Sequence, residues 1–306
     1  MSLFFTLLLK IIPLYVIIAI GFWARRGLDV PKEPIAKLLI YVVAPAVVFL
    51  GTVEAGLKIE LLALPIMFFV IGAVLMLITL LVSKHWWKDG TEKVAAFSAG
   101  TGNTGYFGLP VCLALIGDKA LPVAVMATLG LIFYESTLGF YVVARSSHTA
   151  KDALNKVLRL PVLYAFLLGL SMNIFGFAVH DSIMSVMETL KGAYAPLGMM
   201  IIGLSLAGVQ FAHHLDAKLT ALTFFNKFIV WPMIFLGIIY LDKNYLHWFN
   251  DLVYMVFMIE SITPIAANTV TYAAELKAHP EKAALIVFVS TLIALIYIPA
   301  VVTWLF

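Results

Sequence analysis

Hydrophobic residues form ten long runs along the chain, and charged or glycine- and proline-rich breaks separate each run from the next. A helix needs about 20 apolar residues to cross the hydrocarbon core of a bilayer, and the runs have roughly that length. Backbone that faces lipid must satisfy its hydrogen bonds within its own segment, so we expect every run to be a helix. The pattern predicts an all-α membrane protein with ten transmembrane helices, at residues 4–22, 38–53, 61–82, 94–116, 121–144, 160–179, 195–211, 219–241, 252–274 and 283–305.

The composition of the 306-residue chain agrees with a membrane location, because 63% of the residues are hydrophobic, 12% are charged and the mean hydropathy is +1.03. No basic cluster with interleaved aromatic residues is present, which argues against a nucleic-acid partner. The sequence also lacks a phosphate-binding glycine loop and a cluster of metal-ligating residues. We therefore expect no enzymatic activity, no cofactor and no metal site. We expect the single cysteine, Cys112, to be a small buried apolar residue.

Lysine and arginine are unevenly divided between the two sides of the predicted helices. With the N-terminus outside, fourteen of them fall in inner loops and four in outer loops, while Lys10 and Lys227 lie within helices. Inner loops of membrane proteins carry such an excess of basic residues. The bias predicts a multi-pass protein of the cell inner (plasma) membrane with both termini outside. The four outer residues are Lys58, Lys119, Lys191 and Lys243.

The fifth and tenth predicted helices repeat the same residues. A shift of 163 positions places Asp118-Lys119-Ala120 on Glu281-Lys282-Ala283 and Tyr134 on Tyr297. Each copy holds an odd number of helices, so the second copy enters the bilayer from the opposite side, as in many secondary transporters. We predict two inverted five-helix repeats joined by a cytoplasmic linker, at residues 1–145, 146–159 and 160–306.

The fourth and ninth predicted helices carry residues that a relaxed helix does not tolerate. Four glycines and a proline lie within residues 99–110, and Pro264 lies in a polar stretch at 260–269. Unwound backbone at mid-membrane depth occurs only where it is buried in protein or lines a cavity. Equivalent breaks in two repeats indicate a binding site, where crossed half-helices offer free N–H groups and positive dipole ends to an anion. The alternative is two kinks without function.

Polar residues in and beside the two breaks are the candidates for substrate contact. Asn103 and Asn268 can each donate and accept, so each can serve both the substrate and the unwound backbone. Alternatively, each only satisfies the broken backbone groups. The other predicted substrate contacts are Gly102, Thr104, Ser261, Thr263, Pro264 and Lys227.

Charged residues inside a membrane are costly and are functional candidates for that reason. Glu260 directly precedes the ninth-helix break and is the first candidate for binding the coupling ion, a proton or sodium; the alternative is a structural carboxylate. Lys227 could bind a substrate carboxylate, pair with Glu260 or stay neutral. Glu135 is the second candidate for the coupling ion, with structural pairing as its alternative.

The segment Gly102-Asn103-Thr104-Gly105-Tyr106-Phe107-Gly108-Leu109-Pro110 resembles the span-4 signature of the auxin efflux carrier family, which includes bacterial malate and malonate permease-like members. Residues 260–268, followed by Ala274-Glu275 and Pro280-Glu281, resemble the span-9 signature of the bacterial members. The resemblance covers essentially the whole chain. It implies a fold similar to the bile acid–sodium symporters, with a scaffold from spans 1, 2, 6 and 7 and a moving core that works as an elevator. A homodimer is compatible with it.

These observations together predict a secondary transporter of a small organic anion, such as malate or malonate, that works by elevator-type alternating access. A proton or a sodium ion is the candidate coupling ion. Two alternatives remain at this point. One is a cation/proton antiporter of the same architecture, and the other is a membrane sensor that binds a ligand without moving it.

Overall fold

The computed structural model describes residues 3–55, 58–144, 151, 155, 158–207, 216–275 and 278–305, and every element in these ranges is helical. Seven helical segments there are long and apolar enough to cross a membrane. They confirm an all-α, multi-pass membrane protein. The seven segments are Leu3–Leu28, Lys32–Ala55, Ile59–Ser83, Asp118–Val142, Asp181–Ala207, Ala217–Leu246 and Pro280–Leu305.

The other three predicted helices are shorter or interrupted. The predicted sixth helix is α11 (Pro161–Phe175), which ends where Gly176 adopts a left-handed conformation with φ 68°. The predicted fourth and ninth helices are both broken, at the glycine- and proline-rich positions. The fourth consists of α6 (Thr91–Ala99), the π-helical turn η2 (Thr104–Gly108) and α7 (Leu109–Ile116), and the ninth of α15 (Asp251–Ser261) and α16 (Asn268–Glu275).

Several of the long segments change helical type along their length. Segments of π-helix, which carry one extra residue per turn, occur in three of them. In chain order the remaining elements are α1 (Leu3–Leu28), α2 (Lys32–Leu38), η1 (Leu39–Val43), α3 (Ala44–Ala55), α4 (Ile59–Leu62), α5 (Leu64–Ser83), η3 (Asp118–Ala120), α8 (Leu121–Tyr134), η4 (Glu135–Gly139), α9 (Phe140–Ala144), α12 (Asp181–Ala207), α13 (Ala217–Phe225), η5 (Asn226–Val230), α14 (Trp231–Leu241), η6 (Asp242–Leu246) and α17 (Pro280–Leu305).

The predicted start of the seventh helix at residue 195 is wrong, because α12 already begins at Asp181. Its first turns are polar and therefore look like an outer loop in the sequence. They are held by ion pairs: Lys191 Nζ lies 2.7 Å from Glu188 Oε2 in the same helix and 3.4 Å from Asp118 Oδ1 in η3. The predicted end at residue 211, like most of the predicted linker at 146–159, lies outside the described residues.

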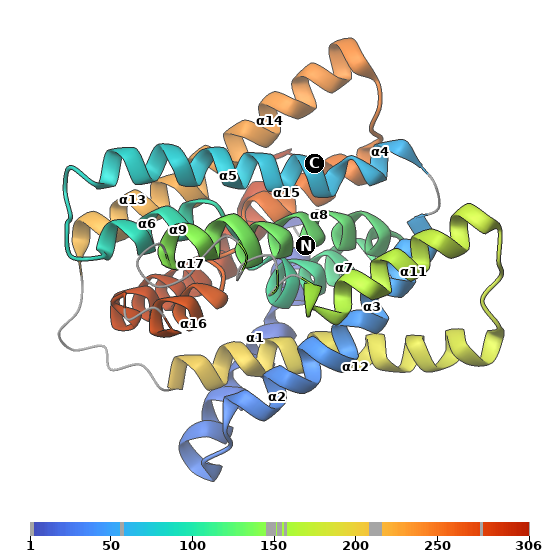
Figure 1. Ribbon diagram of the computed structural model, residues 1–306, viewed down its shortest axis with the longest axis horizontal. Coiled ribbons are helices and arrows are strands. Elements are labelled where there is room, and N and C mark those ends of the chain that lie inside the picture. Colours follow the sequence, from blue (N-terminus) through green and yellow to red (C-terminus); the bar gives the residue numbers. More distant parts are fainter. Residues whose placement is uncertain are drawn as a thin grey trace.

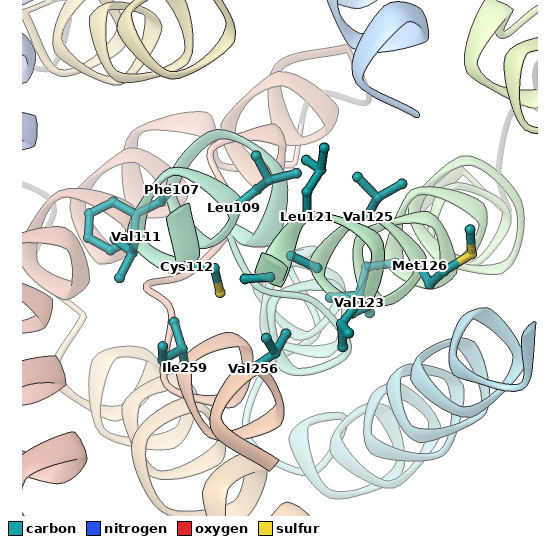
Figure 2. Packing of buried hydrophobic residues seen from close by; sticks show 14 of the residues in the cluster. Phe107, Leu109, Val111, Cys112, Leu121, Val123, Val125, Met126, Val256 and Ile259 are labelled. Atoms are coloured by element: carbon teal, nitrogen blue, oxygen red, sulfur yellow. The ribbon is translucent and has the colours of Figure 1, made fainter. Parts of the chain in front are cut away.

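The helices pack in two groups around a buried apolar core. Helix α1 packs along α12, and α3 packs along both α11 and α12 (Figure 1). Helix α5 packs on α6 and α8, on the other side of the molecule from α12 (Figure 1). Between the groups, α7, α8 and α15 bring Cys112, Val123, Val256 and Ile259 together in one apolar cluster (Figure 2).

Asp216 joins three segments at the ends of the helices. Its carboxylate accepts the backbone N–H of Leu219 at 3.1 Å and so caps α13. It also accepts from Trp87 Nε1 at 3.1 Å, in the α5–α6 connection, and from Lys282 Nζ at 3.2 Å, in the first turn of α17. Partial burial alone would raise the pKa of Asp216, but these hydrogen bonds and the Lys282 charge hold it below its usual value.

The replacement Asp216→Ala is expected to destabilise the protein by about 1–2 kcal/mol at neutral pH, since both the helix cap and the ion pair are lost. A lowered pKa in the folded state stabilises above the unfolded value of about 3.9, and this contribution disappears as the pH falls through the folded pKa. Thermal unfolding in a neutral detergent should therefore show a difference between the two proteins that shrinks in acid. Asp216→Asn, which keeps a capping oxygen, is the matched control and should lose less.

Candidate functional site

The two helix breaks are in direct contact. Backbone leaves the helical conformation after Ala99, at residues 100–103, and again after Ser261, at residues 262–267. The backbone N–H of Asn103 donates to the carbonyl oxygen of Pro264 at 2.8 Å. A peptide group of one break thus satisfies a peptide group of the other, in place of the helical bonds that both have lost.

The first break continues into a tight π-helical turn. The carbonyl oxygen of Asn103 accepts from the N–H groups of Phe107 and Gly108, at 3.2 and 2.8 Å, and this starts η2. The side chain of Asn103 is 4% exposed, and its amide nitrogen has no hydrogen-bond partner among the described residues. Thr104 is buried beside it. An unsatisfied buried amide can donate to a ligand without giving up an internal bond.

The second break is held by local hydroxyl groups. Ser261 Oγ donates to the carbonyl of Met258 at 2.8 Å, and Thr263 Oγ1 donates to the carbonyl of Glu260 at 2.8 Å. Pro264 has no N–H to donate, and the next N–H, of Ile265, donates to Ser290 Oγ of α17 at 3.1 Å. The hydroxyl groups of Ser261 and Thr263 therefore donate to carbonyl groups in the last turn of α15.

Lys227 reaches the crossing from η5. It is fully buried, and its Nζ lies 4.8 Å from the ring centre of Trp231. A Cβ atom added to Gly102 would overlap Lys227 Nζ, so the side-chain nitrogen lies against the unwound backbone of the first break. Nζ has no hydrogen-bond partner in the described part of the chain.

Glu260 occupies the other side of the same crossing. It is fully buried in the last turn of α15, and a Cβ atom added to Gly108 would overlap its Oε2. Its Oε1 accepts from Cys112 Sγ at 3.7 Å, whereas Oε2 has no hydrogen-bond partner within the described ranges. Lys227 is not bonded to Glu260, so the two opposite charges face the crossing separately.

Glu135 links the two breaks through its carboxylate. It begins η4 and is buried. Its Oε1 accepts from the hydroxyl of Thr101 in the first break, and its Oε2 accepts from Asn268 Nδ2 at 2.8 Å, at the start of α16. The side chain of Asn268, which the sequence predicts as a substrate contact, bonds to this carboxylate.

Three of the buried polar groups stand in or beside π-helical segments. Thr104 begins η2, Glu135 begins η4, and Lys227 is the second residue of η5. Short π-helical segments in membrane and soluble proteins are found often at functional sites, since the extra residue re-aims side chains. The sequence gives no direct sign of these segments.

A small cavity adjoins the second break. It has a volume of about 10 Å³ and lies among α12, α17 and the end of the break, lined by Ile202, Ser205, Leu206, Ala267, Val270, Ala284 and Val287. This is space for about one water molecule. No group of three or more potential metal ligands occurs in the part of the chain that the structure describes.

Three residues of the site were not predicted from the sequence. Thr101 bonds Glu135, Cys112 contacts Glu260, and Trp231 faces Lys227 and donates from Nε1 to the carbonyl of Ala99 at 2.8 Å. Cys112 is fully buried in apolar surroundings, as expected, and also approaches a carboxylate. Trp231 lies four residues after Lys227 on the same helix face, and this spacing is the one signal that could have identified it.

The fold and the site together define a class of protein. It is a multi-pass helical membrane protein in which two broken helices meet at buried polar and charged side chains. The chain belongs to the family described as membrane transport protein, whose sequence model matches residues 6–152 and 143–302. This match confirms the resemblance to the auxin efflux carriers.

Two archaeal relatives agree with this assignment. One is an uncharacterized transporter of Methanocaldococcus jannaschii, 30% identical over 205 residues, which are 63% of this chain and 66% of the relative. The other is an uncharacterized transporter of Methanothermobacter thermautotrophicus, 24% identical over 266 residues, which are 86% of this chain and 85% of the relative. Both relatives are described only as transporters, without a stated substrate, so the comparisons support membrane transport and leave its cargo to the site.

Proposed function

We propose that this protein is a secondary transporter that moves a small carboxylate anion, such as malate or malonate, by alternating access. The observation that carries the proposal is the fully buried Lys227, whose nitrogen lies against Gly102 of the first break without a hydrogen-bond partner among the described residues. A buried cation without a bonded counter-ion is costly. A substrate carboxylate at the crossing would offset that cost.

The unwound backbone and its amides would fix the position of the anion. Asn103 Nδ2 is buried and unbonded within the described ranges, so it can donate to a carboxylate oxygen. Gly102 brings the backbone of the first break next to Lys227 and Thr263. We assign substrate contact to Gly102, Asn103, Thr104 and Lys227 from the first break and η5, and to Ser261, Thr263, Pro264 and Asn268 from the second.

Glu260 is the group that we assign to the coupling ion. Its Oε2 is buried without a hydrogen-bond partner in the described part of the chain, so a proton or a sodium ion bound there would satisfy an oxygen that no residue bonds. Glu135 already accepts two hydrogen bonds, one from each break. We assign it a second coupling role, in which its protonation changes how the two breaks are held together.

The packing supports an elevator movement of two inverted repeats. Helices α1, α3, α11 and α12 pack on one another, while the site residues lie in the two breaks and on α15, α16, η2, η4 and η5. Movement of the second group past the first would expose the crossing to each side in turn. We propose that the repeats comprise residues 1–145 and 160–306, in an inner (plasma) membrane with both termini outside.

Uptake into proteoliposomes tests the proposal. Labelled malate and malonate should enter when an inward-directed proton or sodium gradient is imposed, and Asn103→Ala should raise the KM about 10- to 150-fold, the range for a lost hydrogen bond to a charged group. Asn268→Ala should also change the uptake kinetics, because it removes the hydrogen bond that Asn268 donates to Glu135. Asn173→Ala is the matched control, because Asn173 Nδ2 donates to the carbonyl of Thr52 at 2.9 Å, in α3. Unchanged kinetics in both site variants would contradict the site assignment.

The two buried carboxylates favour one second candidate, a cation/proton antiporter, since both could exchange ions. Sodium movement driven by a pH gradient, without any anion uptake, would support it. Ligand binding with no uptake under any gradient would instead indicate a membrane sensor.

A further inference from the structure

We propose that a groove between α5, α6 and the η4–α9 segment binds an anionic glycerophospholipid. The groove has a volume of about 650 Å³. One part of its lining is apolar and the other carries charge. The lining residues are Leu77, Leu80, Lys84, Glu92, Lys93, Leu138, Tyr141 and Val142.

The groove lies where α5 leaves the apolar part of the membrane. The membrane-spanning segment ends at Ser83, and Lys84 follows it directly. On the last turns of α5, Leu77 is 46% exposed and Leu81 is 64% exposed, so this face of the helix has no protein cover and faces lipid in the bilayer. Trp86 is also exposed, as expected of an aromatic side chain at a membrane–water boundary.

The charged side chains at one end of the groove favour a negatively charged lipid headgroup. Neither Lys84 nor Lys93 forms an ion pair or a side-chain hydrogen bond with any other residue that the structure describes. Glu92 already has a partner, because its Oε2 accepts from the backbone N–H of Gly90 at 2.9 Å. Two unpaired cations therefore remain beside one engaged carboxylate, and a lipid phosphate complements them.

The arrangement matches the two parts of a phospholipid. An acyl chain fits along Leu77, Leu80 and Leu138, while the phosphate reaches Lys84 and Lys93. Leu138 belongs to η4, whose first residue, Glu135, holds the two breaks together. A lipid in the groove would rest on the outer side of that π-helical segment.

Native mass spectrometry of the purified full chain in a neutral detergent tests the site, with phosphatidylglycerol and phosphatidylcholine as the titrated lipids. Phosphatidylglycerol should bind more tightly. The double variant Lys84→Gln/Lys93→Gln should weaken its binding about 30-fold, the value expected for two lysines at a lipid headgroup. Lys58→Gln/Lys119→Gln, which removes two lysines from other loops, is the matched control and should leave the affinity unchanged.

A second variant tests the apolar half of the groove. Leu77→Trp adds bulk at an exposed position, so it should fold normally and still reduce phosphatidylglycerol binding. Three results would each overturn the proposal: equal affinity for the two lipids, an unchanged affinity in the double variant, or binding of inorganic phosphate alone as tight as that of phosphatidylglycerol. It would also be overturned if the protein were a dimer that Leu77→Trp converts to a monomer, because a second copy would then fill the groove.

Discussion

Replacing Lys227 with methionine is expected to abolish anion uptake and to destabilise the protein by about 3 kcal/mol. Methionine keeps most of the volume of the side chain but removes the cation that lies against Gly102. Glu260, which is fully buried at the same crossing, would then lose the opposite charge that Lys227 provides there. Removing one member of a buried charge pair costs more than removing both.

The double variant Lys227→Met/Glu260→Gln separates the two roles of the lysine. It should regain most of the lost thermal stability, because no net charge remains at the crossing, and it should still fail to transport. Lys10→Met is the matched control, since Lys10 also lies within a long apolar helix but is exposed and, in the described part of the chain, donates to the carbonyl of Leu115 at 3.3 Å. Full uptake by Lys227→Met would show that the lysine is not needed for the anion.

Alanine at Gly102 or Gly108 is expected to reduce uptake strongly and to destabilise the protein by about 1–3 kcal/mol, the usual cost of overpacking. The added methyl group at Gly102 would overlap Lys227 Nζ, and at Gly108 it would overlap the carboxylate of Glu260. Either change pushes a charged group away from the crossing.

Two other glycines provide the control. An added Cβ atom would meet nothing within 4 Å at Gly192, in α12, or at Gly237, in α14. Gly192→Ala and Gly237→Ala should therefore fold as well as the natural chain or slightly better, by up to about 1 kcal/mol from helix propensity. If all four variants behave alike, glycine at the crossing has no special role and the proposed packing is wrong.

The helix breaks could be predicted because their causes are local. Pro264 lacks an N–H wherever it stands, and four glycines between residues 99 and 110 weaken any helix. The start of α12 could not be predicted in the same way. Its polar first turns depend on a bond between Lys191 and Asp118, which are far apart in the sequence.

The hydrogen-bond partners of the site residues could not be predicted from the sequence either. Glu135 was recognised as a costly buried charge, yet its bonds to Thr101 and Asn268 depend on how three helices meet. Sequence shows which residues are expensive to bury, and only the fold shows which residue each one faces. The same reason left open whether Lys227 bonds Glu260, which it does not.

The bond between Asn103 and Pro264 runs from one peptide group to another. Every residue type except proline can supply the donating N–H at the first position, and every residue type supplies the accepting oxygen at the second. This one bond between the two breaks therefore places almost no demand on the side chains of the two residues that form it. Sequences can diverge widely around it, and cargo preference can be rewritten by neighbouring side chains, while the joint itself stays in place.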